Sequence, residues 1–212
     1  MKRIIFIILM MTTIPGRAQT GNNELVKVNE MIPGIVIDLK YNTLDNFTGQ
    51  KLYTTNECFL ARIVVERLMI VQDSLNKIRE HDGVQYPEGL GLKIWDGYRP
   101  RAIQYLMWEI LPDPTYVANP STGSSHNRGA AVDLTLVDLA TGEELQMPTY
   151  FDDFSEQAWH TYTDLPENVL ANRELLKNMM IGVGGFALYN AEWWHYSYGA
   201  ATGYPLLDFQ MK

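Results

Sequence analysis

The 212-residue chain has one cysteine, four histidines and few basic residues. A single cysteine cannot form an intramolecular disulfide, so packing has to stabilise the fold. Cys58 lies among apolar residues in NECFLARIVV, which predicts a buried, unreactive thiol rather than a nucleophile. The formal net charge is −8, with 17 Lys and Arg against 25 Asp and Glu. This shortage of basic residues argues against a nucleic-acid partner, because phosphate binding needs a basic surface.

The sequence also lacks an apolar run long enough to cross a bilayer. At the N-terminus, Lys2-Arg3 precede a short apolar run over residues 4–11, and residues 12–18 follow and end in the small-x-small pattern Gly16-Arg17-Ala18. This order is typical of a secretory signal peptide. We therefore predict a signal peptide over residues 1–18, an exported protein, periplasmic or secreted, without stable membrane insertion, and one domain over residues 19–212.

Hydrophobic spacing predicts both helices and strands. The expected helices cover residues 57–81, 100–111 and 166–180. The expected strands cover residues 92–95, 130–139 and 186–190, a hairpin turn at Thr141-Gly142 leads into residues 143–147, and residues 192–199 are extended. Residues 112–129, rich in Pro, Gly, Ser and Asn, predict a long surface loop. Because the elements do not alternate as βαβ units, we expect a single α+β domain with a mostly antiparallel sheet packed by helices.

A histidine and an aspartate lie seven positions apart in SSHNRGAAVDL. If a strand begins near Ala130, Asp133 projects from the face opposite the apolar row, and a loop ending at Gly129 can bring His126 beside it. The small Gly129 would let the backbone come close to a bound group. A catalytic zinc site takes three His or carboxylate ligands and leaves a position for water. His195 in EWWHY is the candidate third ligand.

Glu192, three residues before His195, is the candidate general base beside such a metal. In a regular strand, residues three apart face opposite sides of the sheet. Both side chains can reach one site only if the strand is irregular, so we predict a bulge or a helical turn at Trp193-Trp194.

Arg99 in DGYRP is the candidate cation for stabilising an oxyanion, because Pro100 stiffens its loop. Alternatively, Arg99 pairs with Asp96 and only braces the loop.

Each metal-site stretch also has an alternative interpretation. His126 could lie on a surface loop, Asp133 could cap a strand end, and EWWHY could be an aromatic core segment. The combination of His-x6-Asp and Glu-x2-His favours the metal site. His81 and His160 are predicted not to be ligands.

SSHNRGAAVDLTL, WDGYRP and EWWHY together resemble the D-alanyl-D-alanine dipeptidases of the vancomycin-resistance type. These enzymes belong to the zinc D,D-peptidase family, which shares its fold with the hedgehog signalling domain. IDLKYNTLDNFTG and YPLLDFQMK resemble the termini of the same family, so the resemblance covers almost all of residues 19–212. It implies hydrolysis of a small D-amino-acid dipeptide with one zinc ion (Zn2+) per chain. The implied ligands are His126, Asp133 and His195, with Glu192 as the base and Arg99 at the oxyanion.

The resemblance also implies substrate contacts. Asp152 would meet the amino group of the dipeptide, Ser124 its carboxylate, and Tyr41 would line the cavity. Pro148 stands where the family commonly has glycine, a departure that bears on the loop presenting Asp152, and Asp153 is a rival for the amine contact. By the same resemblance, the loop over residues 112–123 looks shorter than in some relatives, which would open the cavity.

Three other functions are compatible with the sequence. A zinc D,D-carboxypeptidase trimming peptidoglycan stem peptides would use the same residues, and it would leave the amino end of the substrate free. A non-catalytic zinc-containing binding module would need neither Glu192 nor Arg99. A wall-binding lectin would use the 5 Trp and 12 Tyr residues, although their spread through predicted core elements suits packing better. The residues alone report neither the stereochemistry of the substrate nor the oligomeric state.

Overall fold

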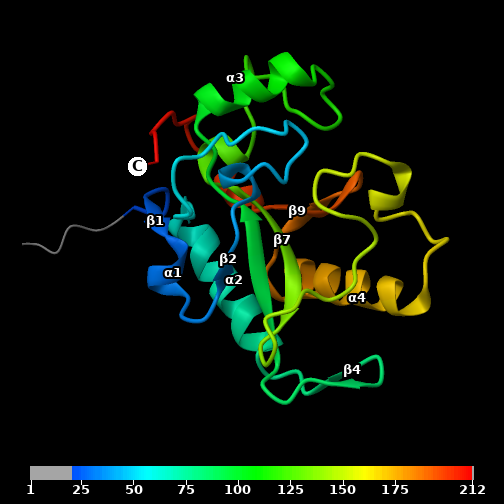
Figure 1. Ribbon diagram of the computed structural model, residues 1–212. Coiled ribbons are helices and arrows are strands. Elements are labelled where there is room, and N and C mark those ends of the chain that lie inside the picture. Colours follow the sequence, from blue (N-terminus) through cyan, green and yellow to red (C-terminus); the bar gives the residue numbers. More distant parts are fainter. Residues whose placement is uncertain (1–20, 212) are drawn as a thin grey trace, which may run out of the picture.

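A five-stranded sheet forms the centre of the computed structural model, which describes residues 21–211 (Figure 1). Its strand order is β2-β6-β7-β9-β8, and only the β2–β6 pair is parallel. The strands are β2 (Val36–Ile37), β6 (Leu90–Asp96), β7 (Ala131–Asp138), β8 (Ala187–Tyr189) and β9 (Glu192–Ser197). The predicted α+β domain with a mostly antiparallel sheet is therefore confirmed. The predicted signal peptide lies outside the described residues.

Helices and two small sheets surround this central sheet (Figure 1). The helices are α1 (Val28–Met31), α2 (Arg62–Leu75), α3 (Arg101–Ile110) and α4 (Glu167–Asn178), which continues as a π-helical turn, Met179–Val183. β1 (Leu25–Lys27) pairs with β3 (Phe59–Ala61), and β4 (Glu80–His81) pairs with β5 (Val84–Gln85). Across residues 21–211, no helix has the length and apolar character needed to span a membrane.

Successive side chains of β7 point alternately toward the α2 side and toward the site. Val132, Leu134 and Leu136 are fully buried and join Val64 and Leu68 of α2 in one hydrophobic core. Side chains of Asp133 and its alternate neighbours project from the other face, because successive side chains of a strand point to opposite sides. One face of β7 therefore packs against α2, and Asp133 projects from the opposite face.

The predicted helix over residues 57–81 is wrong at both ends. Residues 59–61 form β3, because pairing with β1 overrides the helical periodicity of this apolar run. At the other end, Asp82 and Gly83 both have positive φ, 50° and 76°, and form the two-residue turn between β4 and β5. Two such residues suit a tight hairpin, so this Asp-Gly pair closes a hairpin rather than ending a helix.

The other predicted elements agree more closely with the structure. The expected helices over 100–111 and 166–180 correspond to α3 and α4, and the expected strands over 92–95, 130–139 and 186–190 correspond to β6, β7 and β8. Residues 112–129 form the expected loop, which contains the 3-10 turn His126–Arg128. Residues 143–147 contribute only an isolated bridge, Val137 to Glu144.

Cys58 is a buried free thiol, as predicted, but it precedes β3 instead of lying within a helix. Burial raises the pKa of this thiol far above its ordinary value. A side chain on Gly97 would come within 2.7 Å of Cys58 Sγ, so the thiol fills the space beneath the loop that follows β6.

Candidate metal centre and active site

Three acidic and imidazole side chains are aligned across the central sheet. Asp133 of β7 pairs with His195 on β9 and with Asp96 on β6. The β6 register shifts between Ile94 and Asp96, which places Asp96 rather than Trp95 opposite Asp133. Residues directly opposite one another on neighbouring strands share a face of the sheet. The bulge therefore brings Asp96 into the same row as Asp133 and His195.

His126 reaches this row from the loop before β7. Its Nδ1 lies 2.7 Å from the carbonyl oxygen of Gly97 and donates to it, which leaves Nε2 free to bind a metal. Two further hydrogen bonds join the same two loops: Arg99 N donates to His126 O, and Asn127 Nδ2 donates to Arg99 O. The imidazole is thus held by the loop that also carries Arg99.

Gly129 ends the turn that carries His126. Its φ is +62°, in the left-handed region that favours glycine. A Cβ atom here would lie 2.8 Å from the backbone nitrogen of Ala61. The missing side chain therefore allows close packing against β3, and not the approach to a bound group that the sequence suggested.

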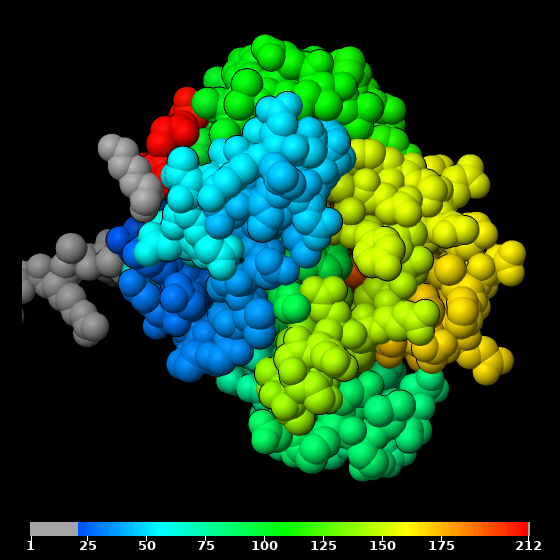
Figure 2. Space-filling view, in the orientation of Figure 1, coloured from blue at the N-terminus to red at the C-terminus, as the bar shows by residue number. Residues whose placement is uncertain are grey.

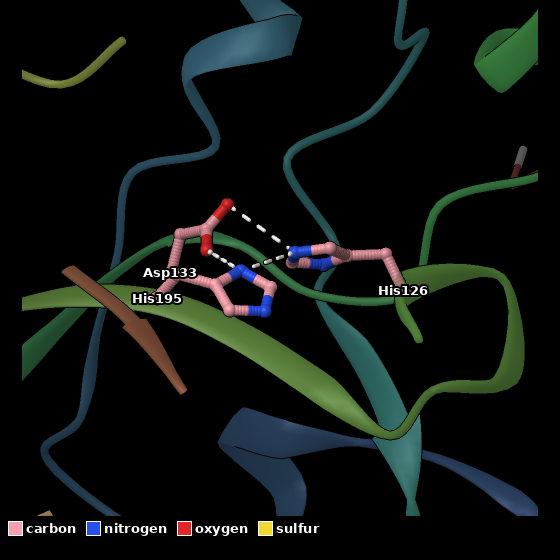
Figure 3. Close-up of side chains that lie close together, drawn as sticks. All are labelled: His126, Asp133 and His195. Atoms are coloured by element: carbon pink, nitrogen blue, oxygen red, sulfur yellow. Dashed lines mark hydrogen bonds and ion pairs between the residues drawn. The ribbon is translucent and has the colours of Figure 1, made fainter. Parts of the chain in front are cut away.

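The three predicted ligands converge on one point (Figure 3). His126 Nε2 lies 3.2 Å from His195 Nδ1 and 3.4 Å from Asp133 Oδ2, and His195 Nδ1 lies 2.9 Å from Asp133 Oδ1. Tetrahedral zinc with bonds of about 2.0–2.2 Å spaces neighbouring ligand atoms roughly 3.3–3.6 Å apart. The three observed separations, 2.9, 3.2 and 3.4 Å, are close to or slightly below this spacing, so the two imidazoles and the carboxylate could hold one small divalent cation.

The pKa shifts of these three side chains favour the binding of a cation. Burial would raise the pKa of Asp133, but His126 and His195 together hold it below its ordinary value. Burial opposes protonation of His126, yet the charge of Asp133 raises its pKa overall. Burial lowers the pKa of His195. The Asp133 carboxylate therefore stays ionised and favours positive charge beside it. A metal ion bound between Asp133 and the two imidazoles can supply that charge.

Glu192 begins β9 at an irregular point of the sheet. The register of β8 and β9 shifts between Leu188 and Tyr189. Leu188 pairs with Tyr196, whereas the next residue, Tyr189, pairs with Glu192, so β9 has extra residues between these two pairs. The predicted bulge falls in this stretch. It allows two side chains three residues apart to face the same cavity.

Glu192 lies close to the three candidate metal ligands but outside the group that could hold the ion. Its Oε2 is 3.8 Å from His195 Nδ1, and the residue is 8% exposed. Burial, and then the charges of Asp133 and Asp152, raise the pKa of Glu192 well above 4.5. A carboxyl group with a raised pKa can hold a proton and release it at neutral pH, as a general acid and base must.

The contacts of Arg99 fit both of its expected roles, bracing the loop and placing a cation in the site. Its Nη2 and Nε donate to Asp96 Oδ2 at 2.6 and 3.1 Å, so it does brace the loop. The same guanidinium also lines the cavity beside His126. Burial would lower its pKa, but the Asp96 carboxylate raises it well above the ordinary value, so the cation is permanent.

A cavity of about 320 Å³ surrounds these groups. The volume is at the lower end of the roughly 300–1,000 Å³ of small-molecule sites. All eight predicted site residues line it: Tyr41, Arg99, Ser124, His126, Asp133, Asp152, Glu192 and His195. The structure thus brings together the whole set that the sequence named.

Asp152, rather than Asp153, faces this cavity. The Tyr41 hydroxyl donates to both oxygens of Asp152, at 3.2 and 3.1 Å, and Phe47 N donates to Oδ2 at 3.0 Å. The space-filling view shows the segment around residues 40–50 directly beside that around residues 145–155 (Figure 2). Asp153 lines a different cavity and accepts a hydrogen bond from Ser155 N. Burial raises the pKa of the Asp152 carboxyl group to about 7.

The sequence reasoning missed several residues that shape the cavity. Asp96 was considered only as a brace, although its side chain anchors Arg99 within the row of site residues. The cavity wall includes Tyr116, stacked on Phe154 with ring centroids 4.5 Å apart, and Tyr189. Tyr116 and Phe154 lie outside helices and strands, where aromatic residues carry no periodic signal, so only the fold reveals their place.

Comparison with known proteins agrees with this site. The sequence matches a peptidase family M15 model described as D-Ala-D-Ala dipeptidase, over residues 21–211. It is 36% identical to the D-alanyl-D-alanine dipeptidase of Escherichia coli (strain K12), over 91% of this chain and 94% of the relative. The enzymes of the same name from Enterococcus faecium and Streptomyces coelicolor are 36% and 35% identical, each over 80% of this chain and over 88% and 89% of the relative. The chain therefore belongs to the D-Ala-D-Ala dipeptidase family of metallopeptidases.

Proposed function

We propose that this protein is a zinc-dependent dipeptidase that hydrolyses D-alanyl-D-alanine and binds one zinc ion per chain. The observation that carries the proposal is the buried group His126, Asp133 and His195 in one small cavity with Glu192 and Arg99. The names of the relatives supply the substrate, and the cavity supplies the means of cleaving it.

The zinc would be held by His126 Nε2, Asp133 and His195 Nδ1. When bound, zinc lowers the pKa of a water molecule and polarises a carbonyl group. The hydrogen bond from His126 Nδ1 to Gly97 O fixes the tautomer that presents Nε2.

Glu192 is the proton carrier in this proposal. Its carboxylate accepts a proton from the water that attacks the scissile carbonyl, and then delivers that proton to the leaving amine. Arg99 donates hydrogen bonds to the carbonyl oxygen as it becomes negative in the tetrahedral intermediate. Because Asp96 already holds the Arg99 guanidinium at the cavity, the positive charge is in place before the negative charge develops.

Asp152 and Ser124 would fix the two ends of the substrate. A free ammonium group is attracted by the carboxylate of Asp152, which Tyr41 and Phe47 hold toward the cavity. Ser124 presents a hydroxyl for the substrate carboxylate from the opposite loop. An N-acylated substrate would bring neither the charge nor the small size that this end accepts, which favours a dipeptidase over a carboxypeptidase.

Paired substrates test the proposal directly. The zinc-loaded protein should release D-alanine from D-Ala-D-Ala much faster than from N-acetyl-D-Ala-D-Ala or L-Ala-L-Ala. Faster cleavage of the acetylated dipeptide would instead indicate the carboxypeptidase. Zinc binding without cleavage of any of the three would indicate a non-catalytic binding module, and carbohydrate affinity without hydrolysis would indicate a lectin.

We further propose that the enzyme acts outside the cytoplasm after removal of residues 1–18. The support is the basic, apolar and small-residue order of that segment. Expression of the full chain in a bacterial host should give a periplasmic or secreted product that begins at Gln19. A cytoplasmic product that retains the segment would contradict this localisation.

A further inference from the structure

Arg99 contacts only one of the two oxygens of Asp96, and its Cζ lies 5.2 Å from the centroid of the Tyr41 ring. Both hydrogen bonds to Asp96, from Nε and Nη2, go to the single oxygen Oδ2. The other oxygen of Asp96 accepts from the Tyr53 hydroxyl at 2.7 Å and from Gly97 N at 2.9 Å. A guanidinium held on both oxygens of a carboxylate is fixed in its plane, whereas one held on a single oxygen can turn about it. A second point of attachment is needed to fix its direction.

Gln104 of α3 supplies that second point. Its Oε1 accepts a hydrogen bond from Arg99 Nη1 at 2.9 Å, on the end of the guanidinium that Asp96 does not touch. Gln104 is 0% exposed and does not line the cavity. Gln104 therefore cannot contact a substrate in the cavity, and it can affect one only through a residue that does.

The other end of the Gln104 amide is also used. Its Nε2 donates to the carbonyl oxygen of Ala118 at 2.8 Å, in the segment of residues 114–118 that lines the cavity. Arginine has no acceptor and a carbonyl has no donor, so the amide has one possible orientation here. One buried side chain thus joins the guanidinium of Arg99 to the cavity wall.

We propose that Gln104 is a positioning residue that aims the Arg99 guanidinium at the carbonyl oxygen of the substrate. This role rests on the proposed hydrolysis. Of the five N–H groups of Arg99, Asp96 and Gln104 occupy three, and the remaining N–H on Nη1 and on Nη2 are left for the oxyanion. Without Gln104 the guanidinium keeps its charge but loses its direction.

The position of Gln104 determines which kinetic constant changes. Negative charge develops on the carbonyl oxygen only in the transition state, so loss of the correct aim lowers kcat more than it raises KM. Gln104→Met, of similar size without the amide, should lower kcat on the order of tenfold. Gln104→Glu again offers an oxygen to Nη1, and the O–H of its protonated form can replace the donor to Ala118 O, so this variant should restore most of kcat.

A double-mutant cycle distinguishes positioning from general destabilisation. Arg99→Lys keeps a cation but has no Nη1, so Gln104→Met should cause no further loss of kcat in that background. Gln72→Met is the matched control, since Gln72 is a second buried glutamine, bonded to Leu92 N and outside the cavity. It should lower thermal stability and leave kcat unchanged. Equal losses from Gln104→Met in both backgrounds would overturn the proposal.

A measurement that needs no substrate separates this inference from the proposed activity. In 15N NMR spectra of arginine side chains, restrained rotation should give Arg99 a separately resolved Nη1 signal, assigned by its absence from Arg99→Lys. That signal should disappear in Gln104→Met and persist in Gln104→Glu. An unchanged Nη1 signal in Gln104→Met overturns the positioning role even if the wild-type protein proves inactive toward D-Ala-D-Ala. Such inactivity would refute the proposed function alone.

Discussion

Replacing Glu192 by glutamine should have two opposite effects. The amide keeps the shape of the side chain but cannot accept a proton, so kcat should fall by about 10²–10⁴, or about 3–5 kcal/mol in activation free energy. The metal-free protein should become more stable. Burial and the charges of Asp133 and Asp152 raise the pKa of Glu192, so ionised Glu192 costs the fold stability as the pH rises above 4.5. Glutamine removes that cost.

The assay combines kinetics with metal analysis and unfolding. Steady-state hydrolysis of D-Ala-D-Ala, zinc content by mass spectrometry and urea unfolding of the metal-free form should be measured for Glu192→Gln and for Glu143→Gln. Glu143 is an exposed glutamate outside the site, so its variant should match wild type in all three. Retained activity in Glu192→Gln would refute its role as the base. Loss of zinc would show that Glu192 is a ligand.

Two further predictions concern other titrating groups. Because the pKa of Asp152 is raised to about 7, the KM for D-Ala-D-Ala should rise as the pH falls from 8 to 6, approaching about tenfold per unit below the pKa. Asp152→Asn should give a high KM that does not vary over this pH range, and the control Asp153→Asn should behave like wild type. The same pH profile of KM in wild type and in Asp152→Asn would exclude Asp152 as the residue that binds the amino group. His160 is buried without a hydrogen-bond partner for its ring, and burial, with Arg173 next, lowers its pKa to about 4. Protonation is therefore disfavoured in the folded state, and the metal-free protein should lose up to about 3 kcal/mol of stability as the pH falls from 6.5 to 4. Urea unfolding of His160→Phe should lack that part of the pH dependence, and identical curves for the two proteins would contradict the assignment.

The convergence of the three candidate metal ligands could be predicted from the sequence because strand geometry constrains them. Alternation along residues 130–139 placed Asp133 opposite the apolar row, and the glycine at 129 marked the turn that returns His126. The spacing of Glu192 and His195 required an irregular strand, and the register shift of β9 supplies it.

Interactions that depend on pairing between distant segments could not be predicted in this way. The sequence showed an amphipathic run over residues 57–81, and nothing local indicated that β1 would take residues 59–61 as a strand. The bulge that turns Asp96 toward Asp133 depends on the β6–β7 register. Nothing in the sequence distinguishes Gln104 from the rest of its helix, because its contacts with Arg99 and Ala118 depend on how α3 packs against the loops.

The central claim is that His126, Asp133 and His195 bind one metal ion together. Anomalous diffraction at the zinc edge from crystals of the zinc-loaded protein tests it most directly. We predict a single strong peak per chain, about 2.0–2.2 Å from His126 Nε2, an Asp133 oxygen and His195 Nδ1. No peak between these three side chains, or a stronger peak elsewhere on the chain, would contradict the account.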